Sequence, residues 1–417
     1  MNGRHSSHTD VRMRGFSSRT LVTEAWSWVD RYCVPRPSEP VAVPLAHGRV
    51  LAADVVADID VPEFPRAAMD GYALRGAETT GAGDYNRLTF AIVGESLPGR
   101  AFDGSVQSAQ AVRIMTGAPI PDGSDAVLPA EYATESEGRV EITKAVAPQK
   151  HVAPRGEDIK RGTTIATAGR RLRPQDVGLL ASVGCQTARV IPRPRVRILT
   201  TGNEIVQPGS ERQPHQIYDA NSPMLSGLVT RDGGEIELCT ALADDREAIR
   251  AAMTAPGADV VILTGGSSVG AEDHAPSVLA EEGELAIHGI AMRPSSPTGM
   301  GMIGERLVFL LPGNPVSCLC AYDFFAGRAI RLLGGRSGDW PYVCRTLPVG
   351  RKFVSAVGRV DYVRARVVDG SAQPLAVGGA SILSSTTRAD GFVILPGPSE
   401  GVAPGGEVVF YYYDSIH

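Results

Sequence analysis

The sequence predicts a multidomain protein with α/β and β parts, and its second half contains a doubly wound α/β domain. From residue 193 to 333 short apolar strands alternate with helices, which is typical of a mostly parallel sheet covered on both faces. At 87–150, and again after Gly334, strand-like segments follow one another with Gly, Pro and Asp turns between them. These two regions therefore favour β domains.

The first 60 residues combine a tail, a helix and a strand. Residues 1–19 carry four arginines and no apolar segment of signal-peptide length, so we expect a disordered tail. A helix should follow and end before Pro35, with Leu21, Ala25, Trp28 and Val29 on one face. A short helix at 45–50 and a strand at 54–57 come next.

The middle of the chain is predicted as mostly strands. A loop at 62–75 enters a strand, and further strands are expected at 88–93, 111–115, 126–129 and 140–142. A helix should begin at Pro174, because proline is favoured in the first helical turn.

Arg193-Pro194-Arg195 marks the start of the alternating region. We expect strands at 196–200, 235–240, 260–263, 285–292 and 307–311, and helices at 222–231, 246–253, 275–282 and 316–333.

Composition excludes several classes of protein. A formal charge of −5 and an aromatic content of 6% argue against nucleic acid as a partner. No segment approaches the ~20 apolar residues of a membrane span. The six cysteines form no Cys-x-x-Cys pair, so we expect reduced, buried thiols in a soluble cytoplasmic protein.

Three of the predicted strands run into turns of small residues, at 200–204, 264–270 and 311–317. In an open α/β sheet such turns gather at one edge, where ligands bind. Glycine lets backbone N–H groups approach an anion, which favours a site for phosphate or another polar ligand. For Asn314 and Pro315 a simpler interpretation stays open, since Asn caps helices and Pro suits their first position.

Acidic residues follow these turns and form a candidate metal site. Singly, Glu204, Asp219, Asp244, Asp245 and Asp273 would be helix caps or surface residues. Together at one edge their oxygens would suit Mg²⁺ bridging phosphates.

Two further patterns have ordinary structural explanations. Asp70-Gly71 fits a turn entering a strand. The five basic residues of 351–366 fit a solvated face by default, with a basic patch beside an anion site as the alternative.

Seven motifs in this order resemble one family, the molybdopterin molybdenumtransferases, which include MoeA and the E-type domain of gephyrin. They are Met-Asp-Gly-Tyr-Ala at 69–73, Met-Thr-Gly-Ala-Pro at 115–119, Arg-Gly-Glu-Asp-Ile at 155–159, Thr-Gly-Asn-Glu at 201–204, Tyr-Asp-Ala-Asn at 218–221, the glycine loop 265–270 with Asp273, and Leu-Pro-Gly-Asn-Pro-Val-Ser at 311–317.

The resemblance implies four domains after the tail at 1–19. They are a discontinuous mixed α/β domain (20–62 and 152–192), an inserted β domain (63–151), a MogA-like doubly wound domain (193–335) and a C-terminal β-barrel (336–417). It also implies a homodimer whose active site combines the doubly wound domain of one subunit with the Asp70 region of the other. Molybdopterin adenylyltransferase and apo-molybdoenzymes are the implied protein partners.

The implied reaction inserts molybdate into adenylylated molybdopterin and releases AMP, with Mg²⁺ or another divalent ion assisting cleavage of the phosphoanhydride. The implied catalytic residues are Asp70, Thr116, Glu204, Asp244 and Asp273, the last three also as metal ligands. The implied substrate-binding residues are Gly202, Asp219, Asn221, Gly265, Gly266, Ser267, Gly270, Pro312, Gly313, Asn314 and Pro315. The implied molybdate-binding residues are Arg293, Ser296, Ser317, Arg359, Arg364 and Ser385.

One segment departs from the family pattern. Where the family has Lys-x-x-x-Lys-Pro-Gly-Lys-Pro, this chain has Gly289, Arg293 and Ser296 at the three lysine positions. Only Arg293 keeps a positive charge. The alternative is therefore a non-catalytic or tungstate-preferring relative that binds molybdopterin or its adenylate as a carrier or scaffold.

Overall fold

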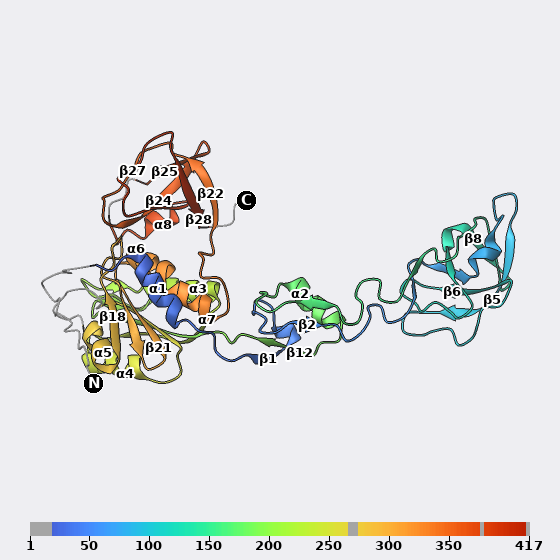
Figure 1. The fold of residues 1–417 in the computed structure, drawn as a ribbon, viewed down its shortest axis with the longest axis horizontal. Helices are drawn as coiled ribbons and strands as arrows, with labels where there is room; N and C mark the ends of the chain where they lie inside the picture. The colour runs from blue at the N-terminus through green and yellow to red at the C-terminus, as the bar shows by residue number, and fades with distance from the viewer. Residues whose placement is uncertain (1–18, 266–273, 376–378, 414–417) are drawn as a thin grey trace. The chain divides into compact units, whose positions relative to one another are not determined.

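The computed structural model describes residues 19–265, 274–375 and 379–413. The chain divides into two compact units (Figure 1). Unit 1 takes Met1–Glu39, Gly48–Val50 and Val190–His417, and unit 2 takes Pro40–His47 and Leu51–Arg189.

A six-stranded sheet forms the centre of unit 1. Its order is β16 (Glu235–Leu242), β13 (Arg195–Thr201), β17 (Val260–Thr264), β21 (Arg306–Leu311), β20 (Gly299–Ile303), β18 (Glu284–His288). The first four strands run parallel, β20 runs antiparallel to β21, and β18 runs antiparallel to β20, so the expected mostly parallel sheet is confirmed. The strand expected at 285–292 ends earlier, at His288, and β20 was not expected.

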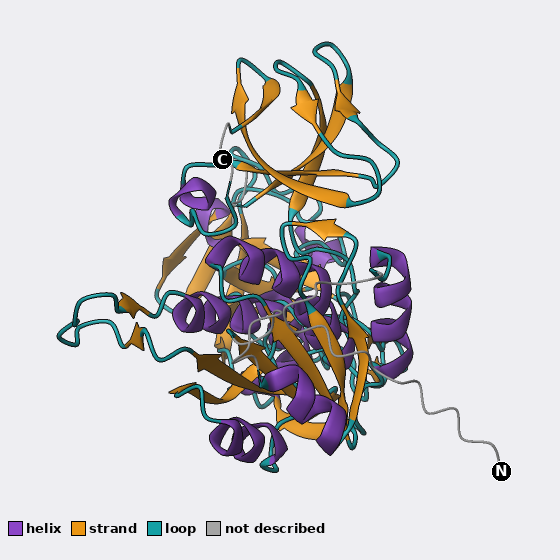
Figure 2. Cartoon of the chain, turned by 90° about the vertical axis from the view of Figure 1, so that its left-hand side faces the viewer, coloured by secondary structure: helices purple, strands orange, loops and turns teal. Residues whose placement is uncertain are grey.

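Helices pack on both faces of this sheet (Figure 2). They are α3 (Asn221–Asp232), α4 (Arg246–Thr254), α5 (Ala275–Glu282), α6 (Pro315–Ala321) and α7 (Gly327–Leu333), with a π-helical turn, η4 (Tyr322–Ala326), joining α6 to α7. Val260 and Ile262 of β17 pack in the cluster that includes α3, α6 and α7, whereas Val261 and Leu263 pack with α4 and α5. Alternate side chains of a strand point to opposite faces, so a strand buried on both sides is apolar throughout.

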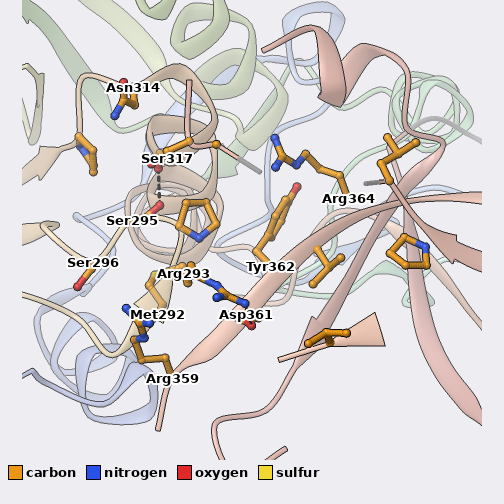
Figure 3. A pocket seen from close by; sticks show the side chains of 18 of the residues that line it. Met292, Arg293, Ser295, Ser296, Asn314, Ser317, Arg359, Asp361, Tyr362 and Arg364 are labelled. Carbon is orange, nitrogen blue, oxygen red and sulfur yellow. Dashed lines mark hydrogen bonds and ion pairs between the residues drawn. The ribbon is translucent and has the colours of Figure 1, made fainter. Parts of the chain in front are cut away.

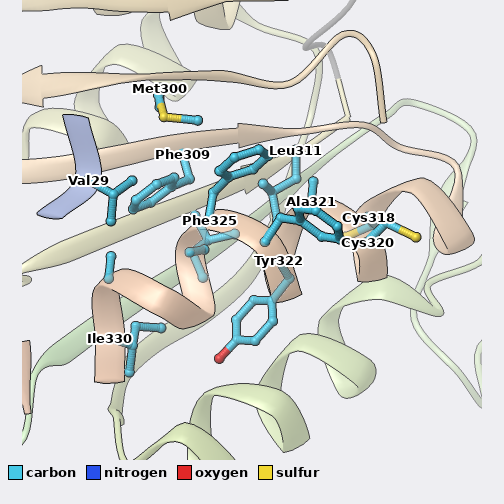
Figure 4. Close-up of a cluster of buried hydrophobic side chains, with 14 of the residues drawn as sticks. Val29, Met300, Phe309, Leu311, Cys318, Cys320, Ala321, Tyr322, Phe325 and Ile330 are labelled. Atoms are coloured by element: carbon cyan, nitrogen blue, oxygen red, sulfur yellow. The ribbon is translucent and has the colours of Figure 1, made fainter. Parts of the chain in front are cut away.

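The first helix, α1 (Val22–Tyr32), packs in unit 1 and not with the mixed domain. Its Val29 lies beside Phe309, Phe325 and Ile330 in the main core (Figure 4). The first part of the predicted segment 20–62 therefore packs in unit 1, because the apolar face of α1 is buried against the doubly wound sheet. Val22 is buried on that face, whereas Leu21, which was expected there, is 53% exposed.

A second sheet is formed by the C-terminal part of unit 1. Its order is β19 (Met292–Arg293), β24 (Val360–Val368), β26 (Gly391–Leu395), β28 (Glu407–Tyr412), β22 (Val343–Pro348), and β25 (Ser371–Pro374) pairs with β24. β23 (Phe353–Val354) pairs with β27 (Gly401–Val402), and α8 (Ser384–Thr387) precedes β26. Parallel pairing of β19 with β24 fixes the segment around Arg293 against this sheet.

Unit 2 contains a six-stranded sheet and several two-stranded pairs. The sheet order is β7 (Ala126–Pro129), β4 (Gly71–Leu74), β6 (Gln110–Ile114), β5 (Leu88–Ser96), β9 (Arg139–Ile142), β8 (Ala133–Ser136). The pairs are β3 (Arg66–Ala67) with β10 (Val152–Ala153), β2 (Val55–Val56) with β11 (Thr164–Ala166), and β1 (Glu39–Ala42) with β12 (Thr187–Val190). Short 3-10 turns are η1 (Val43–Leu45), η2 (Gly76–Thr79) and η3 (Ala130–Tyr132).

Two helices expected in unit 2 have different outcomes. α2 (Pro174–Ser182) begins at Pro174 as expected, and Asp176 accepts the backbone N–H of Arg173 at its start. The helix expected at 45–50 is wrong, since only η1 forms and Gly48 turns the chain with φ +76°.

All six cysteines are free thiols, but they are not all buried as expected, since Cys239 and Cys344 are exposed. Burial raises the pKa of the Cys33 thiol to about 12. Among the described helices, none is long and apolar enough to cross a membrane.

Candidate functional site

The turns after β13, β17 and β21 meet around a cavity of about 580 Å³. We call it the acidic cavity, because among the described residues Glu204, Asp219 and Asp244 line it together with neutral residues only. The neutral lining includes Gly202, Asn221, Gly265, Pro312, Gly313, Asn314 and Pro315. The predicted gathering of these turns at one sheet edge is thus present in the structure.

Glycine is required where two of the turns touch. Gly265 has φ +91°, and a Cβ there would lie 2.2 Å from the carbonyl oxygen of Thr201. A Cβ on Gly313 would lie 3.4 Å from the Cα of Gly265. Any side chain at Gly265 would therefore push apart the ends of β13 and β17.

Asn221, the first residue of α3, ties two strand ends together. Its Nδ2 donates to Thr264 Oγ1 at 3.1 Å and to the Gly313 carbonyl at 2.8 Å. Thr264 Oγ1 in turn donates to the Pro312 carbonyl at 3.1 Å. The rim of the acidic cavity is held in one geometry by this network.

Asp219 is buried and has a structural partner. Its carboxylate accepts the backbone N–H of Ser222 at 3.0 Å and the Ser222 hydroxyl. Ser222 Oγ also lies 2.7 Å from Thr200 Oγ1. Asp219 therefore stabilises the start of α3 while it borders the cavity.

The structure separates the two neighbouring aspartates that the sequence left ambiguous. Asp245 caps α4, with its carboxylate accepting the Ala248 N–H at 2.8 Å. Asp244 lines the acidic cavity and accepts the Asn203 N–H at 3.1 Å. Its own N–H returns a bond to Asn203 Oδ1 at 3.2 Å, so the loops after β13 and β16 fix its position.

The donor set of this cavity fits a hard divalent ion. Glu204 and Asp244 supply carboxylate oxygens, and Mg²⁺ is commonly bound by one or two carboxylates plus substrate phosphates and water. Within the described ranges no three His, Cys, Asp or Glu side chains group closely enough to hold a metal by themselves. Four further predicted residues, Gly266, Ser267, Gly270 and Asp273, lie outside the described residues.

Capping alone does not explain Asn314. It stands at the N-cap of α6, but its side chain makes no capping hydrogen bond there. Asn314 is exposed, and it lines both the acidic cavity and a second one.

The second cavity, of about 810 Å³, lies between the Arg293 segment, the start of α6 and the C-terminal sheet (Figure 3). We call it the basic cavity, because its described lining has one carboxylate, Asp361, and five cations. The cations are Arg293, Arg351, Lys352, Arg359 and Arg364. Such an excess of positive charge favours an anionic ligand.

One of these cations is already paired. Arg293 forms an ion pair with Asp361, which is 2% exposed and also accepts the Ser355 hydroxyl at 2.9 Å. Figure 3 shows Arg293 and Asp361 side by side, with Arg364 beyond Tyr362. The second carboxylate oxygen of Asp361 is buried without a hydrogen-bond partner among the described residues.

The predicted serines have different positions around the basic cavity. Ser317 lines it, and its carbonyl accepts the Ser295 hydroxyl at 2.6 Å. Ser385 is absent from the lining but accepts a hydrogen bond from Arg364, so it orients that guanidinium. Ser296 lines the cavity, yet its hydroxyl is engaged by Arg19 at 2.8 Å and by the Ile290 carbonyl at 3.1 Å.

Four of the five basic residues of 351–366 line the basic cavity, which supports the alternative of a basic patch, although Arg351 and Lys352 are also exposed, as the default of a solvated face expects. Arg351 and Lys352 line the basic cavity with Arg359 and Arg364. Arg366 is exposed, does not line the basic cavity, and donates to the Arg388 carbonyl. The density of basic residues in this segment was the available signal.

Asp70 and Thr116 come together in unit 2. The backbone N–H and the hydroxyl of Thr116 both donate to Asp70 Oδ1, each at 2.7 Å. These bonds from Thr116, the backbone one first, hold the pKa of Asp70 below its ordinary value.

Three family models match the chain in succession. The MoeA N-terminal region (domain I and II) matches residues 20–184, a probable molybdopterin binding domain matches 197–332, and the MoeA C-terminal region (domain IV) matches 346–413.

Relatives match over most of the chain. It is 38% identical over 311 residues to molybdopterin molybdenumtransferase 2 of Mycobacterium tuberculosis (strain H37Rv), covering 72% of this chain and 76% of the relative. It is 30% identical over 381 residues to the molybdopterin molybdenumtransferase of Staphylococcus aureus (strain COL), covering 89% and 90%. A crystal structure of a molybdopterin biosynthesis MoeA protein from Pyrococcus horikoshii has a TM-score of 0.74 and 30% identity, covering 95% of this chain and all of that one.

Proposed function

The chain belongs to the MoeA family and acts in molybdenum cofactor biosynthesis, and from this premise we propose that it inserts molybdate into adenylylated molybdopterin and releases AMP. The observation that carries the proposal is the pair of adjoining cavities of opposite charge in unit 1. Pro297, Pro312 and Asn314 border both. One ligand spanning this shared wall would present its phosphates to one cavity and its metal-accepting end to the other.

The acidic cavity would hold the nucleotide and the phosphoanhydride. The close packing of Gly265 and Gly313 leaves no side chain at the centre of the turns, so a ligand can lie against the backbone. Glu204 and Asp244 would repel a bare phosphate, which favours a phosphate that arrives with a divalent ion.

A divalent ion would be held by Glu204 and Asp244, with Asp273 as the third proposed ligand. When bound, Mg²⁺ neutralises charge that develops on the phosphate oxygens during cleavage. The chain's own contribution is position: Asn203 holds Asp244 through two hydrogen bonds. Asp244 therefore needs little rearrangement to act as a ligand.

The basic cavity would hold molybdate, which is a dianion. Arg359 and Arg364 would donate charge-assisted hydrogen bonds to its oxygens, and Ser317 lies on the same wall. Ser385 keeps Arg364 oriented without reaching the anion itself.

The remaining part of the proposal concerns assembly and location. We place Asp70 and Thr116 in the active site of a second copy, which requires a homodimer, and we place the enzyme in the cytoplasm. Mixing an Asp70→Asn chain with an Asp244→Asn chain tests the assembly. Shared sites would recover up to about a quarter of the activity in the mixture, since random pairing leaves one unmutated site in half of the dimers. Activity that stays at the level of either variant alone would exclude sharing.

Complementation tests the function. The wild-type chain should restore molybdoenzyme activity in a strain that lacks its own molybdenumtransferase, and purified protein should release AMP only when molybdate is present. Soluble protein that restores no activity, while still binding molybdopterin, would instead support the carrier alternative.

A further inference from the structure

Two residues that line the acidic cavity, which we call its floor, each carry one buried polar atom that lacks a hydrogen-bond partner among the described residues. The atoms are Asn221 Oδ1 and Thr201 Oγ1. The two residues are 5% and 2% exposed, and both line the cavity. Buried polar atoms are rarely left unpaired in native proteins, so this pair of atoms requires an explanation.

The orientation of the Asn221 amide follows from its partners. The Gly313 carbonyl can only accept, so the atom bonded to it at 2.8 Å must be the NH₂ group. Thr264 Oγ1 uses its own proton on the Pro312 carbonyl, so it also accepts from Asn221. The NH₂ group is therefore fully used, and the free atom is a fixed acceptor.

The walls above this floor suit a flat ring. Tyr218 lies three residues before Asn221, lines the same cavity and is 47% exposed. Its hydroxyl donates to the Ser210 carbonyl at 3.1 Å, and the Arg212 guanidinium lies 5.8 Å from its ring centre. These contacts hold the ring in place as an aromatic surface beside the cavity.

We propose that this floor recognises the amino edge of a planar heterocycle. The exocyclic NH₂ donates to Asn221 Oδ1, the Thr201 hydroxyl bonds the adjacent ring nitrogen, and Tyr218 packs on the ring. This rests on the proposed function, whose substrate carries two such edges, one on adenine and one on the pterin. Both have an amino group next to a ring nitrogen, and an oxo group in its place would oppose the Asn221 oxygen with another acceptor.

Pairs of ligands that differ only in this group test the proposal by calorimetry at fixed Mg²⁺. AMP against IMP reports on adenine, and pterin against lumazine, its 2-oxo analogue, reports on the pterin. For at least one pair we expect the amino compound to bind about tenfold more tightly or better, since an unpaired buried acceptor is costly. In Asn221→Ala that ratio should fall below about twofold. The pair that shows this behaviour identifies the ring held.

Matched variants separate recognition from folding. Thr201→Val removes a hydroxyl that bonds nothing among the described residues of the free protein, and should weaken the preferred amino ligand several-fold without unfolding the chain. Thr200→Val removes the neighbouring hydroxyl, which bonds Ser222 and does not line the cavity, and should leave the ratio unchanged.

Three results would overturn the proposal: equal binding within both pairs, no binding of any of the four ligands, or a ratio that survives in Asn221→Ala. None of them depends on molybdate. If complementation failed while the amino compound still bound more tightly than its oxo analogue, the proposed insertion reaction would be wrong and the proposed recognition would still hold.

Discussion

The acidic and basic cavities of unit 1 adjoin each other but hold their charges in different ways. In the acidic cavity Asp219 and Asp244 are fixed by backbone N–H groups and by neighbouring side chains from their own domain. In the basic cavity Arg293 is neutralised by Asp361. Arg364 lies on β24 of the C-terminal sheet, and Arg359 directly precedes that strand. The first site is therefore built by one sheet edge, and the second by two sheets together.

This difference predicts different consequences of mutation. Loss of a carboxylate in the acidic cavity should affect catalysis, because a divalent ion depends on very few ligands there. Loss of one of the five cations of the basic cavity should mainly lower the affinity for molybdate. Three measurements test the contrast and a fourth concerns Asp70 of unit 2, taken from the largest expected effect to the smallest.

Asp244→Asn should lower the rate of AMP release by about 100-fold or more at fixed Mg²⁺, because an amide oxygen is a much weaker ligand than a carboxylate. The fold should survive, since Asn still accepts the Asn203 N–H. Asp245→Asn is the matched control: Asn caps helices as well as Asp, so α4 and the rate should stay unchanged. Equal losses in both variants would contradict the assignment of Asp244 to the cavity.

Arg359→Gln should raise the half-saturating molybdate concentration about tenfold and change the maximal rate little, because one charge-assisted hydrogen bond of about 1.5 kcal/mol is lost. The control is Arg366→Gln, which removes the same charge outside the cavity. If the two variants respond alike, the effect comes from net charge and not from a contact.

Asp361→Asn should tighten molybdate binding by about threefold to tenfold, because it removes the only carboxylate of the basic cavity's described lining and releases Arg293 from its ion pair. The substituted side chain still offers an amide oxygen to the Ser355 hydroxyl, so the local structure should hold. Weaker binding would show that Asp361 positions Arg293 for the anion.

Thr116→Val should raise the pKa of Asp70 only part of the way back to its ordinary value, because the backbone bond from Thr116, the larger contributor, remains. Asp70 is held charged by these bonds, so its contribution to stability is present above its unfolded pKa and is lost as the pH falls through the lowered folded value. NMR titration measures the shift. No shift at all would show that the hydroxyl bond does not form in solution.

Much of this arrangement could be predicted from the sequence. The apolar strands and their glycine turns identified the parallel sheet and the edge where Gly265 and Gly313 meet, because strand period and turn chemistry are local properties. The distinction between Asp244 and Asp245 could not be predicted, since it depends on where one loop meets Asn203 of another.

Features that depend on contacts distant in sequence were also missed. The ion pair between Arg293 and Asp361 joins residues 68 positions apart. The packing of α1 against the doubly wound sheet could not be predicted either. Its pattern of apolar residues is the same whether the helix packs on that sheet or on the mixed α/β domain. The hydrogen bond from Arg19 to Ser296 could not be predicted either, because the two residues are 277 positions apart.

The wall formed by Pro297, Pro312 and Asn314 has a thermodynamic consequence, because it belongs to both cavities. A ligand that immobilises this wall from one side changes the surface offered to a ligand on the other. Linkage then requires reciprocity: if a bound nucleotide alters the affinity for molybdate by some factor, molybdate alters the affinity for that nucleotide by the same factor. The order in which the two arrive can change the rate of assembly, but not the stability of the ternary complex.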